Sequence, residues 1–138
     1  MIVKKFKQFF MLFLVMFSSQ ASAQSLLSNV EVQAEISAAI EASPMPQQLD
    51  QVTVLESMKL FGVRGLQYNY KLGLTKTDLG GEAALDLMVQ TMKNQTKNVF
   101  CNNPAMLWYK TNFVELNYVY RDKDNAPLME FRLTPNDC

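Results

Sequence analysis

The chain has no histidine among its 138 residues. Catalysis by Ser-His-Asp or Cys-His groups needs an imidazole that accepts and returns a proton, so both classes of enzyme are excluded. The commonest zinc ligand is also missing. We therefore expect neither a metal site nor a cofactor.

Long apolar runs are absent after the first 23 residues. The chain opens with a basic segment containing Lys4, Lys5 and Lys7, continues with about ten apolar residues, and reaches the A-x-A site Ala21-Ser22-Ala23. This order predicts a cleaved signal peptide over residues 1–23 and a periplasmic or secreted product; an uncleaved N-terminal anchor is the alternative. No cysteine lies at the cleavage site, so we expect no lipid anchor. Residues 24–138 have the length of a single domain.

Charge is sparse and balanced. Once the three lysines of the signal peptide are removed, ten basic residues remain against 13 acidic ones, a net charge of −3. The sequence has no basic cluster in this part, which argues against nucleic acid or an anionic membrane as the partner.

Cysteine is nearly as scarce as histidine: the two cysteines are Cys101 and the last residue, Cys138. Two cysteines in a small exported chain most often form one disulfide. A redox-active pair would need the C-x-x-C spacing, which is absent, and an intermolecular disulfide is the remaining alternative. The loop-entropy relation assigns ~4 kcal/mol of stabilisation to a Cys101–Cys138 bridge.

Hydrophobic periodicity predicts two helices and four strands. The first helix covers residues 26–43, with a capping box at Ser28 and Glu31 and a stop at Pro44, and the second covers 82–101. Alternating residues predict strands over 48–61, 66–72, 113–120 and 128–133. In the first strand we expect Val52, Val54, Met58 and Leu60 to share one face, interrupted by Glu56.

The order α-β-β-α-β-β predicts an α+β fold with a four-stranded antiparallel sheet and helices packed on one face. The last hairpin returns the chain to the end of the second helix. Cys138 can therefore reach Cys101.

Aromatic residues supply the main candidate for a functional surface. Tyr68, Tyr70, Tyr118 and Tyr120, together with Trp108, form a possible binding surface. The alternative is that these side chains fill the layer between sheet and helices, since each tyrosine lies on the apolar face of its strand.

Acidic residues supply two further candidates. The stretch RDKDNAP offers oxygens from Asp122, Asp124 and Asn125 for calcium, but it lacks the glycine and the later glutamate of an EF-hand, which favours a solvated turn. Glu56 interrupts an otherwise apolar strand face. It is either an acid in a pocket or a residue of an edge strand that reaches solvent.

The C-terminal stretch from Cys101 through FVELNYVYRDKDNAPLMEFRLTPNDC resembles small exported bacterial proteins in which a cysteine at a helix end pairs with one after a terminal hairpin. These include type II secretion pilotins of the AspS kind and small secreted proteins of unassigned role, some regulated by quorum sensing. The resemblance covers about 40 residues and implies a structural role for Cys101 and Cys138. Pilotins also carry a lipobox cysteine, which this chain lacks.

Together these features predict a non-enzymatic periplasmic or secreted protein that binds another protein, with a component of a secretion system as one candidate partner. An inhibitor or immunity protein for a secreted enzyme is the second hypothesis. An enzyme that uses carboxylates such as Glu56 or Asp86 is the third.

Overall fold

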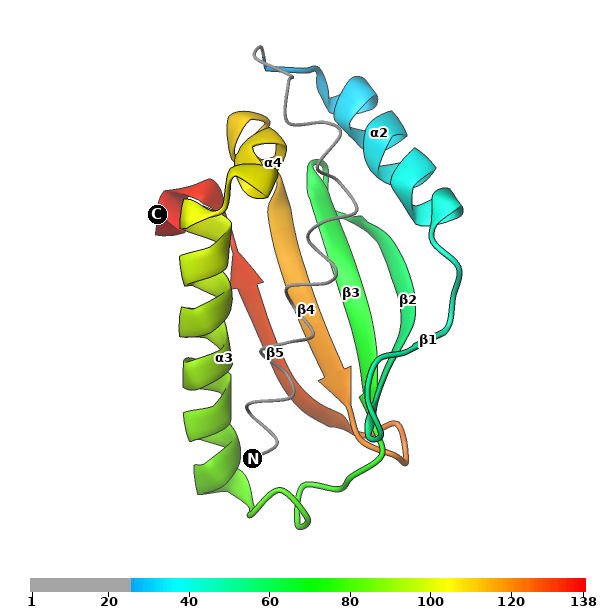
Figure 1. Ribbon diagram of the computed structural model, residues 1–138, viewed down its shortest axis with the longest axis vertical. Coiled ribbons are helices and arrows are strands. Elements are labelled where there is room, and N and C mark those ends of the chain that lie inside the picture. Colours follow the sequence, from blue (N-terminus) through cyan, green and yellow to red (C-terminus); the bar gives the residue numbers. More distant parts are fainter. Residues whose placement is uncertain (1–25) are drawn as a thin grey trace.

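A computed structural model describes residues 26–138 (Figure 1); the predicted signal peptide, residues 1–23, lies outside the described residues. The sheet has five strands in the order β1-β2-β3-β4-β5. The strands are β1 (Gln47–Gln48), β2 (Thr53–Phe61), β3 (Gly65–Leu72), β4 (Glu115–Arg121) and β5 (Pro127–Leu133). The helices are α2 (Asn29–Ala42), α3 (Glu82–Asn102) and α4 (Leu107–Thr111), with short 3-10 turns η2 (Pro104–Met106) and η3 (Pro135–Asp137).

The predicted α+β class is confirmed, but the prediction of four antiparallel strands is wrong. β3 and β4 are parallel neighbours, whereas the other pairs are antiparallel. The reason is the connection between them: α3 has 21 residues and is about 31 Å long at 1.5 Å per residue, enough to carry the chain back along the whole length of β3. β4 therefore starts at the same end of the sheet as β3.

The predicted first strand is divided into β1 and β2, and its predicted face is only partly right. β1 forms the extra, fifth strand, and a turn at Asp50 separates it from β2, where the Asp50 carboxylate accepts a hydrogen bond from the Val52 N–H (2.8 Å). The pairing with β3 shifts between Leu55 and Ser57, which makes Glu56 the extra residue of a β-bulge. Because the bulge inverts the alternation, Leu55 joins Met58 in the core in place of Val54.

Both long helices form where the sequence predicts them. α2 starts at the expected capping box, in which the Ser28 hydroxyl accepts from the Glu31 N–H and the Glu31 carboxylate accepts from the Ser28 N–H. In α3 the buried residues recur every three or four positions (Leu85, Met88, Met92, Thr96 and Phe100). Helix α3 packs against β5, and α2 packs against β2. None of the helices within residues 26–138 is both long and apolar enough to span a bilayer.

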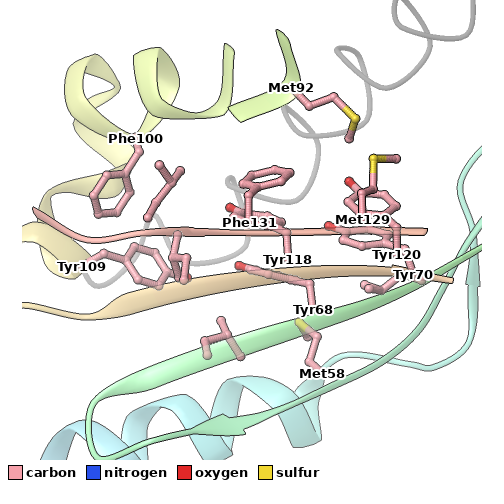
Figure 2. Packing of buried hydrophobic residues seen from close by; sticks show 14 of the residues in the cluster. Met58, Tyr68, Tyr70, Met92, Phe100, Tyr109, Tyr118, Tyr120, Met129 and Phe131 are labelled. Carbon is pink, nitrogen blue, oxygen red and sulfur yellow. The ribbon is translucent and has the colours of Figure 1, made fainter. Parts of the chain in front are cut away.

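Aromatic rows form the centre of the core (Figure 2). Tyr68, Tyr118 and Phe131 stack across β3, β4 and β5 with ring centroids 5.0 and 4.8 Å apart, and Tyr70 stacks on Tyr120 at 4.5 Å. The parallel register of β3 and β4 creates these pairs, because it sets identical residues side by side. Each stacked pair adds about 0.5–1.5 kcal/mol beyond the burial of its area.

Candidate docking groove

Four separate parts of the chain meet at one end of the sheet: the start of α2, the turn between β2 and β3, the junction of α4 with β4, and the C-terminal turn η3 (upper end in Figure 1). A groove of about 440 Å³ lies between them, and we refer to it as the end groove. It is lined by Asn29, Val63, Arg64, Phe113, Glu115, Thr134, Pro135 and Asn136.

Arg64 braces this end of the molecule. Its Nε donates to the carbonyl oxygen of Asn112 (2.8 Å), and its Nη1 donates to Oδ1 of Asn29 at the start of α2 (2.7 Å). The backbone carbonyl of Arg64 accepts from the N–H of Glu115 (2.9 Å). One side chain thus ties α2, the β2–β3 turn and the α4–β4 junction together.

Asn112, whose carbonyl oxygen accepts from Arg64, adds side-chain hydrogen bonds of its own. The side chain is fully buried, yet its Oδ1 accepts from the Leu27 N–H (2.8 Å) and its Nδ2 donates to the Trp108 carbonyl (2.9 Å). A buried amide is costly without such partners, and here it fixes the segment before α2 to the end of α4. These hydrogen bonds fix the position of Asn112, directly before the lining residue Phe113.

The rim of the end groove is apolar and exposed. Phe113 and Val63 are each 57% exposed. Phe113 also has a φ of 51°, in the left-handed region, directly after Asn112 at the end of α4. Glycine is the usual residue at this position, and a side chain there costs about 1–2 kcal/mol. Phe113 nevertheless has this conformation, and its exposed aromatic ring lines the groove.

The C-terminal turn η3 forms another wall, and the predicted disulfide holds it. Cys101, at the end of α3, is bonded to Cys138, with Cα atoms 5.5 Å apart. Within the turn, the Asp137 carboxylate accepts from the Thr134 N–H (2.7 Å). The cross-link thus connects the wall of the groove to the last turn of α3.

The two ionisable side chains of the lining are both engaged in structure. Arg64 holds the brace, and the carboxylate of Glu115 lies 3.9 Å from the guanidinium of Arg132. Arg132 in turn stacks over the Phe61 ring, 4.8 Å from its centroid. The end groove therefore combines apolar side chains, Val63, Phe113 and Pro135, with polar ones such as Asn136, and this combination suits the binding of an apolar group that is flanked by polar groups.

The aromatic residues predicted as a possible binding surface lie elsewhere. Tyr68, Tyr70, Trp108, Tyr118 and Tyr120 are at most 1% exposed, so the structure places them in the core and not on a surface. Burial raises the pKa of Tyr68, Tyr70, Tyr118 and Tyr120 above the usual value. Stacking between sheet and helices explains their spacing.

The acidic candidates do not form a site. Oδ1 of Asp122 accepts from the N–H groups of Asp124 (2.8 Å) and Ala126 (2.9 Å), which builds the β4–β5 turn. Glu56 and Asp86 are exposed, on β2 and α3 respectively. In the part of the chain that the structure describes, no three potential metal ligands of the His, Cys, Asp or Glu types cluster together.

The end groove is difficult to predict from the sequence. Its residues come from four regions up to about 100 positions apart, and the alternation of 113–120 assigns Phe113 to a strand. One signal is available: a polar Asn112 before the strand predicts a helix end, where left-handed backbone is common.

The chain is thus a small α+β protein with a mixed sheet and helices, and a disulfide bonds its last residue, Cys138, to the end of α3. No protein-family model matches the chain, and no curated protein matches it.

Two solved structures share the fold. One is PA3611 of Pseudomonas aeruginosa, a protein thought to be secreted, at a TM-score of 0.62 and 14% identity over 83% of this chain and 98% of that one. The other is the type II secretion system pilotin AspS of Vibrio cholerae, at a TM-score of 0.51 and 10% identity over 79% and 97% of the two chains. The resemblance inferred from the C-terminal sequence is confirmed at the level of fold.

Proposed function

We propose that this is an exported, non-enzymatic accessory protein that binds a protein partner in the context of secretion, and that the partner docks in the end groove. The observation that carries the proposal is Phe113. An exposed ring in a left-handed conformation is unfavourable for the isolated fold, and such residues cluster at sites of function.

The surroundings of Phe113 support a role in docking. Aromatic side chains are enriched in protein interfaces, and rigid anchors lose little conformational entropy on binding. The Arg64–Asn112 brace and the disulfide supply that rigidity. The shared fold with a secreted-type protein and a secretion pilotin supports the secretion context.

The lining of the groove favours binding over catalysis. General acid–base chemistry needs a titratable group free to reach its substrate. Arg64 is committed to two hydrogen bonds, and Glu115 lies beside Arg132.

The test is affinity capture from the exported protein fraction of the source bacterium, using oxidised protein as bait. Wild type is compared with Phe113→Asp and with the matched control Leu87→Asp, which alters a side chain 66% exposed on α3. We expect one protein to be retained by wild type and by the control but lost with Phe113→Asp.

Two results contradict the proposal. Equal retention by all three baits would place the interface outside the end groove. Failure to retain any protein reproducibly would argue against a protein-binding role.

A further inference from the structure

The other end of the sheet carries an unusual pair of charges. Lys71 on β3 and Arg121 on β4 are register partners on neighbouring parallel strands. Lys71 directly follows the core residue Tyr70, and Arg121 directly follows the core residue Tyr120. Because side chains alternate along a strand, the two cations lie on the same face of the sheet, opposite the core. Adjacent strands are only about 4.8 Å apart, and like charges placed side by side repel and weaken the sheet.

A groove lies beside Lys71. It has a volume of about 290 Å³, and its lining includes Lys71, Lys123, Gln48, Gln51 and Val54 but no carboxylate. We refer to it, together with Arg121, as the basic groove. Lys71, Arg121 and Lys123 form no ion pair with any residue in the described range 26–138.

Several acids lie near Lys123: Asp122 and Asp124 flank it in the sequence, and Asp78 interacts with it. Hydrogen bonds from Thr75 lower the pKa of Asp78, and the charge of Lys123 lowers it further. Lys123 is thus partly balanced. Neither Lys71 nor Arg121 has a salt-bridge partner within 4.0 Å among the described residues, so like charges lie side by side on neighbouring strands without a direct ion pair.

We propose that the basic groove binds an acidic segment of a protein partner. Carboxylates of that segment neutralise Lys71, Arg121 and Lys123, while the side-chain amide of Gln51, also in the lining, faces its backbone. The repulsion between Lys71 and Arg121 is relieved only in the complex, so their charge contributes to binding and opposes the stability of the free protein.

The shape of the site favours a peptide over a membrane. The site is concave, and a flat bilayer cannot enter it, whereas an extended chain can. The proposal is independent of the end groove, which lies at the opposite end of β3.

The test uses a fluorescently labelled octaglutamate peptide as the probe, at low salt. The double variant Lys71→Gln/Arg121→Gln is compared with Lys93→Gln/Lys97→Gln, which changes the net charge equally on α3. We expect the first variant to weaken binding by about fivefold for each charge removed and to melt at a higher temperature than wild type. The control should change binding by less than about twofold, because it lies outside the groove.

Three results overturn the proposal. Equal weakening by both double variants would show a response to net charge alone. A lower melting temperature for Lys71→Gln/Arg121→Gln with unchanged peptide binding would make the pair structural. Tighter binding to phosphatidylglycerol vesicles than to the peptide would identify a membrane site.

Discussion

Removal of the disulfide tests the architecture most directly. Cys101 and Cys138 are 37 positions apart, and the loop-entropy relation for a loop of this size gives a loss of ~4 kcal/mol for Cys101→Ser/Cys138→Ser. For a domain of about this length, 1 kcal/mol corresponds to roughly 4 °C, so we expect the melting temperature to fall by about 15 °C.

The assay is thermal unfolding followed by circular dichroism, with and without a dithiol reductant. Reductant should lower the melting temperature of wild type to that of the variant and leave the variant unchanged. Amide hydrogen exchange should also speed up selectively at Thr134–Asp137, since η3 has no buried residue to hold it in place. A fall of less than about 4 °C, with unchanged exchange in η3, would refute the assigned role of the bond.

Three further predictions concern local features. Phe113→Gly should raise the free energy of unfolding in urea by up to ~1 kcal/mol, because glycine relieves a φ of 51°; a loss of more than ~1 kcal/mol would contradict the strain. Gly65→Ala should cost about 1–3 kcal/mol or more, because a Cβ there would lie 2.1 Å from the Phe61 carbonyl oxygen, whereas Gly73→Ala, with 3.8 Å of clearance, should cost far less. All five tyrosines are buried, and burial raises their pKa values above 10.0, so their contribution to stability is complete below pH 10 and is lost as the pH rises through the folded-state values. Tyrosinate absorbance should therefore appear only together with alkaline unfolding, and ionisation of the native protein near pH 10 would contradict this burial.

Local chemistry made several elements predictable. Ser28 and Glu31 have the spacing of a capping box, and the structure forms it. In strand β3 the predicted apolar residues Leu66, Tyr68 and Tyr70 are buried, although Gln67 on the opposite face is buried as well. These features depend on neighbours within about four positions, and such neighbours are read directly from the sequence.

Non-local geometry was not predictable in the same way. A bulge at Glu56 reverses the two faces of β2 without any change in composition. The parallel pairing of β3 with β4 depends on the path of α3 and not on either strand. Two hairpins separated by a helix are compatible with both pairings, and the sequence pattern alone does not distinguish them.

The candidate sites were beyond prediction for a related reason. Lys71 is 50 positions before Arg121 and 52 before Lys123, so the chain shows no basic run. They come together only because β3 and β4 are in parallel register. The fold thus concentrates cations at a point that the sequence pattern does not mark.

The position of the disulfide links the stability of the protein to its proposed function. The core contains two rows of stacked aromatic rings, and η3 contributes no buried residue to it. Yet η3 provides Pro135 to the wall of the end groove. A wall without a hydrophobic anchor needs another restraint, and the bond from Cys138 to Cys101 supplies it in an oxidising compartment. The end groove should thus lose its shape on reduction before the sheet and the long helices unfold.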